Sequence, residues 1–568
     1  MEEFIRVARG ERPAELVLKK ARVVNVFSGE IVSGDVAIYR GKIAGVGKYE
    51  GEKEEHLDGC LVAPAFIDSH IHLESTLLLP AELARVVVPR GTSTVVADPH
   101  EMANVQGKEG VRFLIEASRE LPLDVYFMAP SCVPATHMET AGAELTAADI
   151  TDMLNWERVL GIAEMMNYPG VLFTDPAVMA KIKAGEGRRI DGHAPGLLGE
   201  ELNAYAAAGI ASDHEAVTAE EALARVRAGM YVMVREGSTA KNIAAVAPII
   251  SAENSRRFLL VSDDRHPEDL MAEGHVDWLL RRAVAEGIPP LLALQMVTLN
   301  PAEYFGFRGR GAVAPGYRAD LVVLEDLREF KVIQVYRKGQ LVARTGQLLI
   351  SVSPSVTVTE RNRLRVTADL TEKLKVKAEG GKIKVIGLIP DQIVTEKLYL
   401  DAKVEEGLVV ADPSRDIVKI AVIERHRGTG NVSVGFVRGL GLKKGALAAT
   451  VAHDSHNLIV AGVSDADMEM AVQTLVEKGG GMVAVAEGEI LAVLPLPVAG
   501  LMSDRPAAEV AEASEAIKKA ARQLGCVPAN PFMALSFLAL PVIPHLKITD
   551  RGLVDVDRFA FVSLFGEE

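Results

Sequence analysis

Between residues 63 and 304 the chain repeats one pattern eight times: a short apolar run, polar residues at its end, and then a stretch with helical spacing. Such runs are typical of strands, and the stretches between them include plausible helices at 80–89, 109–120 and 218–228. Eight β/α units over roughly 240 residues match the usual size of a (β/α)8 barrel. We therefore predict an α/β fold with a TIM-like barrel, whose strands lie within 63–72, 92–101, 123–131, 161–167, 189–196, 209–217, 230–238 and 258–265.

Polar residues gather where the predicted strands end, and His70 and His72 stand at the end of the first one. On a strand, residues i and i+2 point to the same face, so the two imidazoles would lie side by side. The carboxyl ends of the strands form the catalytic face of barrels of this kind. The pattern therefore predicts a functional site at this rim, built from side chains of several strands.

Short β-like segments separated by glycine-containing turns flank this block on both sides. They predict one composite β-sandwich domain made of residues 1–62 and 305–348, closed around a catalytic barrel of residues 63–304. From about residue 350 onward the chain changes to hairpins and strands, followed by helix-like stretches at 464–480 and 507–525. This change predicts an additional mixed α/β C-terminal domain over residues 349–568.

The overall composition argues against several function classes. A formal net charge of -15 disfavours a nucleic-acid partner, because phosphate binding needs clustered Lys and Arg. Three cysteines without a CxxC motif predict neither a disulfide framework nor a thiolate metal site. The sequence has no signal-peptide pattern and no apolar run long enough to cross a bilayer, so we expect a cytoplasmic protein with a small-molecule substrate and no membrane partner.

Six polar residues at the predicted strand ends form a candidate set of metal ligands. Imidazoles and carboxylates suit divalent Zn, Mn or Fe. A single histidine on a barrel strand is more often structural, so the joint pattern carries the prediction. One catalytic ion with a bound water uses about three protein ligands. Two ions that share a bridging carboxylate would use the whole set: His70, His72, Glu164, His193, His214 and Asp263.

Several motifs resemble the amidohydrolase superfamily and, more narrowly, the bacterial and archaeal adenine deaminase family. They are FIDSHIHLEST at 66–76, DPHE at 98–101, AEMMN at 163–167, DGHAPG at 191–196, SDHE at 212–215, SDDRHP at 262–267 and AHDSHN at 452–457. The resemblance spans almost the whole chain. Many related enzymes bridge their metals with a carboxylated Lys on the fourth strand, whereas this chain has Glu164 there, as adenine deaminases do. Two lysines beyond that strand are expected to be solvated: Lys181 and Lys183.

The resemblance implies hydrolytic deamination of adenine to hypoxanthine and ammonia, by a metal-activated hydroxide in a binuclear site that serves purine salvage. It implies two divalent cations, with Mn2+ favoured and Fe2+ or Zn2+ as alternatives, and a homo-oligomer. One ion would bind His70, His72 and Asp263, and the other would bind His193 and His214. Glu164 would bridge the two ions.

The same resemblance suggests roles for the carboxylates near these ligands. Asp263 is expected to receive the proton of the nucleophile, and Asp264 could do so instead. A structural pair between Asp264 and Arg265 is the competing interpretation. Glu215 is expected to point away from the metal and to orient a ligand or the purine. Three carboxylates that precede metal-site histidines either orient those histidines or cap strand ends: Asp68, Asp191 and Asp213.

Two further motifs are expected to complete the site. The DPHE motif places Asp98, His100 and Glu101 beside it. The AHDSHN motif is expected to pack over the barrel mouth, where it would cover the substrate, bind the purine or exclude water. A third metal site and a polar turn without function are the alternatives for that motif. Its candidate residues are His453, Asp454 and His456.

Two other functions stay open on the sequence alone. The chain could be another aminohydrolase or amidase of the superfamily, acting on a different heterocycle. It could also be a catalytically silent barrel scaffold. A silent relative would be expected to lose some ligands, whereas all six positions are filled here, so the scaffold is disfavoured.

Overall fold

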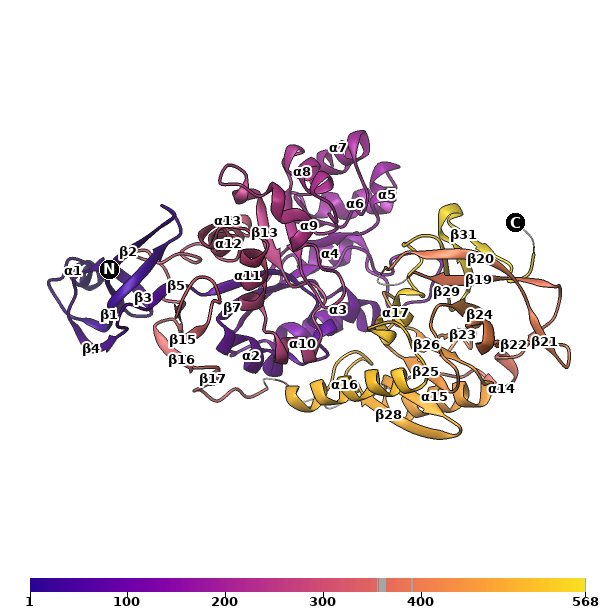
Figure 1. Cartoon of the computed structure of the whole chain (residues 1–568). Coiled ribbons are helices and arrows are strands. Elements are labelled where there is room, and N and C mark those ends of the chain that lie inside the picture. The colour runs from indigo at the N-terminus through magenta and orange to yellow at the C-terminus, as the bar shows by residue number, and fades with distance from the viewer. Residues whose placement is uncertain (355, 357–363, 390–391, 567–568) are drawn as a thin grey trace.

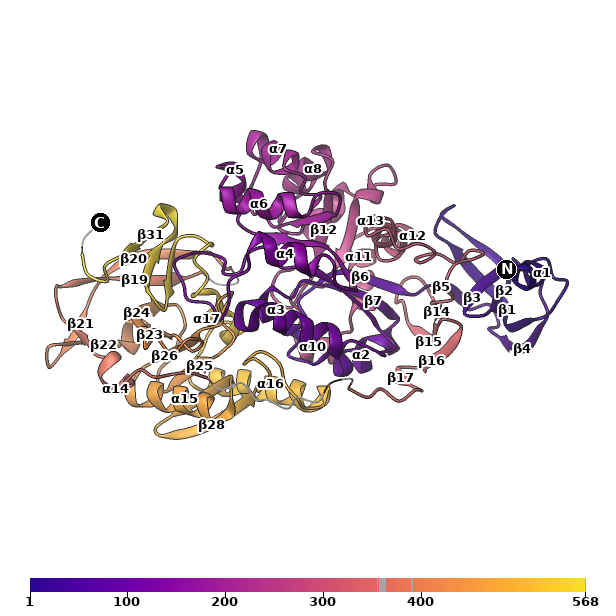
Figure 2. The same cartoon turned by 180° about the vertical axis from the view of Figure 1, so that it is seen from behind.

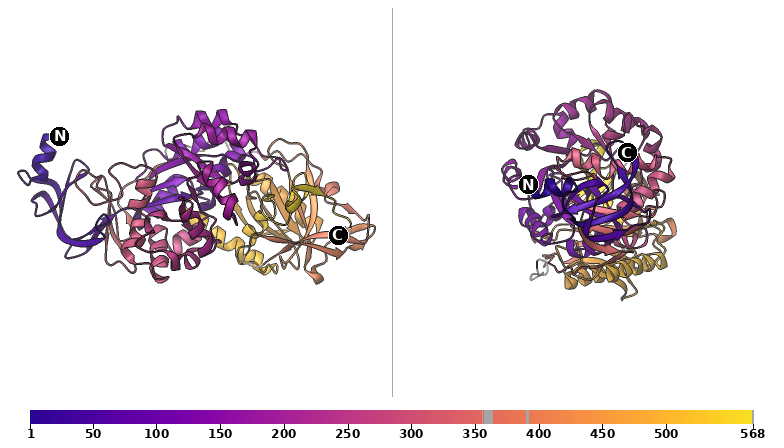
Figure 3. Two further views of the ribbon diagram at one scale, coloured as in Figure 1. Left: turned by 90° about the horizontal axis from the view of Figure 1, so that it is seen from above. Right: turned by 90° about the vertical axis from the view of Figure 1, so that its left-hand side faces the viewer.

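The computed structural model describes residues 1–354, 356, 364–389 and 392–566. A sheet with the N-terminus lies at one end of the molecule, the barrel lies in the middle, and the C-terminal part lies at the other end (Figure 1). The views from behind and from above show the same order (Figures 2 and 3). Residues 357–363, where the predicted C-terminal strands begin, lie outside the described residues.

Eight strands form the barrel, which confirms the predicted fold class. Five of them pair side by side in the order β10-β9-β8-β7-β6, and three pair in the order β11-β12-β13. Backbone hydrogen bonds join these sets at both edges, among them those from Ala211 N–H to Ile190 O at 2.8 Å and from Asp263 N–H to His70 O at 3.0 Å. The strands are β6 (Phe66–Ile71), β7 (Thr92–Ala97), β8 (Asp124–Ala129), β9 (Val159–Met165), β10 (Arg189–Gly192), β11 (Ser212–Asp213), β12 (Tyr231–Arg235) and β13 (Phe258–Val261).

Helices cover the outside of these strands, which explains why the strands read as continuous apolar runs. In β7, for example, every residue is buried. Thr218 begins a helix with a capping box to Glu221, so the TAEE sequence acts as a start signal. Another helix starts at His100 rather than near residue 109, which places His100 and Glu101 in its first turn. The helices are α2 (Pro80–Val87), α3 (His100–Ala117), α4 (Ala147–Met153), α5 (Tyr168–Leu172), α6 (Pro176–Ala184), α7 (Gly199–Ala207), α8 (Ala219–Arg227), α9 (Ile243–Val246), α10 (Pro267–Ala272), α11 (Val276–Ala285), α12 (Pro290–Met296) and α13 (Leu299–Tyr304).

A nine-stranded sheet joins the segment before the barrel to the segment after it. In this sheet β5 pairs with β1 on one side and with β14 on the other. Strands from both segments bury apolar side chains in one core, including Val23, Val36 and Leu321. The boundaries predicted for a composite domain, 1–62 and 305–348, stay a prediction. The strands are β1 (Ala14–Asn25), β2 (Glu30–Tyr39), β3 (Lys42–Gly47), β4 (Gly51–His56), β5 (Leu61–Pro64), β14 (Leu321–Leu324), β15 (Val332–Arg337), β16 (Gln340–Arg344) and β17 (Gln347–Leu348).

The C-terminal part is built on an eight-stranded sheet in the order β20-β19-β24-β23-β26-β25-β27-β28. Two long helices belong to it, α15 (Asp465–Lys478) and α16 (Ala507–Gln523), and α16 also reaches the barrel, where Lys518 pairs with Glu268. Among the described residues, no helix has the length and apolar character needed to span a membrane. The sheet strands are β19 (Lys382–Leu388), β20 (Thr395–Asp401), β23 (Ile417–Ile423), β24 (Val432–Arg438), β25 (Ala446–Ala449), β26 (Leu458–Gly462), β27 (Gly481–Ala486) and β28 (Glu489–Pro495).

Candidate metal centre

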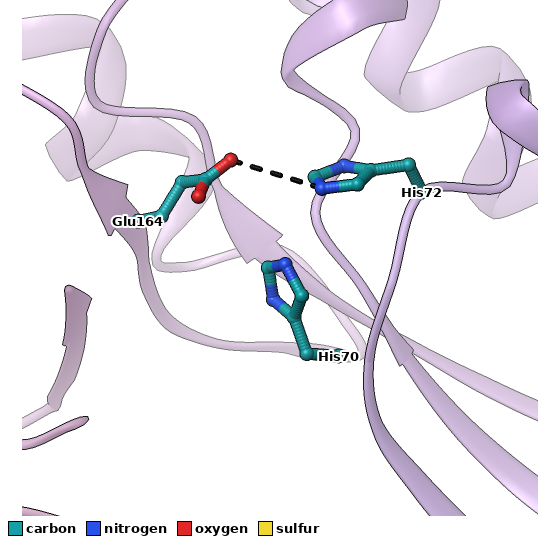
Figure 4. A group of neighbouring side chains, drawn as sticks. All are labelled: His70, His72 and Glu164. Carbon is teal, nitrogen blue, oxygen red and sulfur yellow. Dashed lines mark ion pairs between the residues drawn. The ribbon is translucent and has the colours of Figure 1, made fainter. Parts of the chain in front are cut away.

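The six predicted ligands meet at one rim of the barrel. Each lies at or just after the carboxyl end of its strand, where parallel strands bring their ends together. Five of the six are buried, and the side chain of His193 is 19% exposed. Figure 4 shows that the side chains of His70, His72 and Glu164 point into one common space. The structure therefore brings together residues from five strands that are far apart in the sequence.

Glu164 lies between two groups of histidines. Its Oε2 lies 2.9 Å from both His193 Nδ1 and His214 Nε2. Its Oε1 faces the other group, at 3.8 Å from His72 Nε2 (Figure 4). Burial alone would raise the pKa of this carboxyl, but the charges and hydrogen bonds of His214 and His193 outweigh burial and hold the pKa well below its usual range. Each oxygen can thus serve a different group of ligands.

Asp263 completes the group around the first two histidines. Its Oδ1 lies 3.1 Å from His72 Nε2 and 3.5 Å from His70 Nε2. Its backbone is left-handed, with a φ of 56°, a conformation that non-glycine residues adopt mainly where the surroundings hold them. Burial would raise the pKa of Asp263, but the nearby imidazoles of His70 and His72 and the charge of Arg235 keep it well below its usual range. The carboxylate form is therefore favoured.

The arrangement of donors fits two divalent cations. His72 Nδ1 lies 3.1 Å from the carbonyl oxygen of Asp98, and a carbonyl can only accept, so Nδ1 carries the proton. His72 Nε2 thus keeps its lone pair toward Glu164 and Asp263. Metal-binding histidines are commonly fixed in this way through their second nitrogen. His70 Nε2 is buried without a hydrogen-bond partner among the described residues. Imidazole and carboxylate ligands of this kind suit Mn2+, Fe2+ or Zn2+.

Glu215 differs from its predicted orientation. We expected it to point away from the metal site, but its Oε1 lies 3.5 Å from His214 Nε2 and 3.6 Å from His193 Nδ1. The expectation assumed strand alternation, whereas β11 ends at Asp213, before both residues. Arg235 balances this buried carboxylate, because its Nη1 and Nη2 both donate to Glu215, the latter at 2.9 Å. Glu215 therefore belongs to the inner wall of the site.

Asp264 does not pair with Arg265, so that structural interpretation is wrong. Ser75 Oγ donates to Asp264 Oδ1 at 2.5 Å. Arg265 turns the other way, pairs with Glu273 and lies over the ring of Trp278, with its guanidinium carbon 3.8 Å from the ring centroid. Asp264 is thus left at the rim, beside the candidate ligands His72 and Asp263.

The DPHE residues lie beside the candidate ligands, as predicted. The Glu164 N–H donates to Asp98 Oδ2 at 3.2 Å, so Asp98 supports the central carboxylate from behind. His100 Nδ1 lies 3.2 Å from Glu164 Oε1. Glu101 points toward the C-terminal part, where its Oε1 lies 2.9 Å from His453 Nδ1. This ion pair connects the barrel to the AHDSHN motif.

The AHDSHN motif forms a short loop over the barrel residues, and we call residues 452–457 the roof loop. A hydrogen bond from His456 N–H to Ala452 O, at 2.7 Å, closes it into a single turn. His453 stacks on Phe537 with ring centroids 4.9 Å apart. Asp454 Oδ1 lies 3.9 Å from His100 Nε2. The group Glu101, His453 and His456 also has donor atoms within 4.8 Å of one another, so the geometry leaves the alternative of a third metal site open.

The three carboxylates that precede site histidines have structural partners. Asp68 accepts from Ser262 Oγ at 2.5 Å, and its Oδ2 lies 2.9 Å from His275 Nε2. Asp213 pairs with the buried Arg225 at 2.8 Å. Asp191 accepts from Ser212 and from Tyr304. These contacts join strands and helices of the barrel, which favours the structural interpretation over the one in which they orient ligands.

The two lysines beyond the fourth strand differ from each other. Lys183 is exposed, as expected. Lys181 is half-buried, and its Nζ donates to Ser131 O at 2.8 Å, so the expectation of a solvated side chain is wrong for it. The bond ties α6 to the loop after β8 and leaves Glu164 as the carboxylate on the fourth strand.

Sequence reasoning missed two buried residues at the rim. Arg235 Nη1 donates to Asp263 Oδ2 at 3.1 Å as well as to Glu215, and its signal was the REGS sequence at the end of the seventh strand. Glu74 accepts from the Met102 N–H at 2.8 Å. Burial and the nearby charge of Glu101 raise the pKa of Glu74 to about 7. Its position in FIDSHIHLEST was visible, but nothing local indicated its environment.

Comparison with known proteins covers both the barrel and the C-terminal part. Residues 61–342 match the amidohydrolase family, and residues 392–560 match the adenine deaminase C-terminal domain. The chain is 52% identical over 566 residues to adenine deaminase 2 of Carboxydothermus hydrogenoformans, and 50% identical over 566 residues to adenine deaminase of Desulfatibacillum aliphaticivorans, with 99% of each protein covered in both cases. Adenine deaminase of Methanothrix thermoacetophila is 47% identical over 570 positions, which cover 100% of both chains. Because this identity extends over the whole length and the barrel rim carries the expected residues, the chain belongs to the adenine deaminase family of the amidohydrolase superfamily.

Proposed function

We propose that this chain hydrolyses adenine to hypoxanthine and ammonia at a site that holds two divalent cations. The single observation that carries the proposal is the position of Glu164, whose two oxygens face two separate groups of histidines. The relatives named adenine deaminase supply the substrate. A single ion would leave half of this buried donor set without a role.

The two cations would share the six residues. His70, His72 and Asp263 would hold one ion, His193 and His214 would hold the other, and Glu164 would contact both. The donor types favour Mn2+, with Fe2+ or Zn2+ as alternatives. When bound, such ions make a water molecule acidic enough to act as a nucleophile near neutral pH.

Carboxylates at the barrel rim would accept and deliver the protons of the reaction. Attack at C6 of adenine needs a base for the nucleophile and proton delivery to the ring nitrogen and the leaving amine. Asp263 is suited to receive the first proton, because it is buried at the rim and Arg235 holds its Oδ2 at 3.1 Å. Asp264 is the alternative and is oriented by Ser75. Breaking the C6–N bond then releases ammonia.

The roof loop would close the site above the purine. His453 and Asp454 reach Glu101 and His100 of the barrel. These four residues are 4% exposed or less, so the loop would exclude water and leave polar atoms for the purine. Glu215 would support the ion held by His193 and His214 from the side.

The broader setting follows from the same proposal. The two regions that match known families, 61–342 and 392–560, support a catalytic barrel of residues 63–304 and a C-terminal domain of residues 349–568. The product would enter purine salvage, and the protein would act in the cytoplasm as a homo-oligomer. Size determination in solution tests the last point directly.

The decisive experiment uses Glu164→Gln, with Glu236→Gln as a matched control. Glu236 is another buried carboxyl at a barrel strand end, and it binds Ile243 N–H rather than any candidate ligand. After Mn2+ reconstitution, we expect two ions per wild-type chain and adenine-dependent ammonia release. Glu164→Gln should lose metal and nearly all turnover while remaining folded, and the control should keep both. Two bound ions and a normal rate in Glu164→Gln would refute the bridge, and a silent wild type would refute the substrate.

A further inference from the structure

Arg425 is a buried cation whose side chain, among the residues that the structure describes, donates hydrogen bonds to backbone carbonyls and pairs with no carboxylate. It lies two residues after the end of β23, and it is 2% exposed. The guanidinium donates to His456 O, to Ala499 O at 3.0 Å and to Thr450 O at 3.4 Å. Burial lowers the pKa of Arg425 to about 9, and the neighbouring Glu424 only partly opposes this. Glu424 is engaged in its own turn, where it accepts from three backbone N–H groups.

Burying a charge that only carbonyl groups contact costs free energy of folding, so we looked for a role of this arginine that offsets the cost. The contacts of Arg425 indicate one, because they converge on the roof loop. Its side chain binds His456 O, and its backbone N–H donates to Asn457 Oδ1 at 3.4 Å. Arg425 therefore binds the end of the roof loop through both its side chain and its backbone.

These contacts stabilise the loop at His456, whose backbone is left-handed with a φ of 52°. A non-glycine residue stays in that conformation only where surrounding contacts hold it. Ala452 supplies part of the hold, since its N–H donates to His456 Nδ1 at 3.2 Å. Arg425 adds a further contact at the carbonyl oxygen of His456.

Gly500 shows how closely the guanidinium is enclosed. A Cβ atom at this position would lie 2.7 Å from Arg425 Nη1, and the φ of Gly500 is +74°. Gly500 O also accepts from Thr450 Oγ1 at 2.7 Å, which joins the two segments that Arg425 contacts. Any side chain at residue 500 would displace the guanidinium.

We propose that Arg425 is a positioning residue for the deaminase reaction: it locks the roof loop so that His453 and Asp454 stay on Glu101 and His100. The inference rests on the proposed function of the loop. Arg425 itself touches no candidate ligand, and its effect passes through the loop backbone. Without it, the left-handed turn at His456 relaxes and the ion pair between His453 and Glu101 is lost.

The test compares Arg425→Ala with Lys419→Ala. Lys419 is a matched control, because it is a buried cation on β23 that binds Leu374 O and Asp465, away from the roof loop. We expect Arg425→Ala to keep its metal and to lose about 10²-fold in kcat for adenine, since small displacements at an active site cost that much. Millimolar guanidinium should restore at least a tenth of the lost rate. The control should keep wild-type kcat and should not respond to guanidinium.

Two readouts keep the inference falsifiable. Hydrogen exchange over residues 452–457 should rise in Arg425→Ala and fall again with guanidinium, which is measurable even if the wild type does not accept adenine. Gly500→Ala should show the same loss of kcat and the same rise in hydrogen exchange. Added guanidinium should not restore its rate, because the Arg425 side chain is still present in this variant. Wild-type kcat and exchange in Arg425→Ala or, if that variant does not fold, in Gly500→Ala would overturn the inference. Loss of metal in either variant would also overturn it.

Discussion

Replacing Glu139 by Gln is expected to make the folded chain more stable at alkaline pH. Glu139 lies in the loop after β8, is 3% exposed and accepts from the Thr136 N–H at 3.2 Å. Burial, and then the charge of Asp454 in the roof loop, raise the pKa of Glu139 to about 8. The folded chain therefore holds this proton at pH 7, whereas the unfolded chain has released it.

The sign and size of the effect follow from the two pKa values. Between the ordinary pKa of 4.5 and the folded pKa of about 8, the folded state binds more protons, so stability falls as pH rises. Above pH 8 the loss is complete, and it reaches about 5 kcal/mol at most. Glu139→Gln removes the ionisation and should remove this loss. For a cooperative unit of the barrel's size, a shift of roughly 2–4 °C per kcal/mol applies, so half of the effect would raise the apparent Tm at pH 9 by about 5–10 °C.

The assay is thermal unfolding of the wild type and Glu139→Gln from pH 5 to pH 9. The two Tm curves should meet near pH 5 and separate steadily up to about pH 8. Glu144→Gln is the control, because Glu144 is exposed in the same loop and its curve should follow the wild type. Parallel curves for Glu139→Gln and the wild type would refute the assignment of a buried neutral carboxyl at this position.

Two further variants test the rim and the roof loop. Arg235→Met leaves the buried Glu215 without its cation, which should cost about 3–5 kcal/mol of stability and lower the Tm, and an unchanged Tm would contradict the pairing. His456→Ala should lower kcat while metal content stays largely intact, because His456 lies in the roof loop and is none of the six candidate ligands at the barrel rim. Loss of metal, measured by elemental analysis, would instead identify the loop as a source of ligands.

The catalytic face of this chain is assembled from two parts rather than from the barrel alone. The loop after β8 is held by the C-terminal part, since the Thr140 N–H donates to Asp550 at 2.9 Å and Asn457 donates to Thr140 O at 2.8 Å. Thr549 donates to Met138 O at 2.7 Å. These bonds hold the β8 loop against the C-terminal part, and the charge of Asp454 in the roof loop accordingly raises the pKa of Glu139 in the β8 loop.

The sequence alone determined the barrel and the types of residue at its rim. Each strand is a local apolar run with a polar end, and parallel strands must bring those ends to one edge, so His70, His193 and Asp263 could be expected to meet. The spacing of two residues within a strand also predicted that His70 and His72 would lie close, and their rings are 4.9 Å apart. Local pattern was sufficient because the geometry of a strand repeats.

Only the tertiary structure decided the directions and partners of side chains that lie beyond the ends of the strands. Glu215 lies two residues beyond the end of β11, so strand alternation no longer fixes the direction of its side chain. It points inward, where Arg235 of another strand donates to it. Asp264 accepts a hydrogen bond from Ser75 and does not pair with its neighbour Arg265. The pairing of His453 with Glu101 depends on how the C-terminal part docks on the barrel. These contacts join different elements, 20 positions apart for Glu215 and Arg235 and 189 positions apart for Ser75 and Asp264, and their energy comes from burial and charge pairing that no short stretch of sequence encodes.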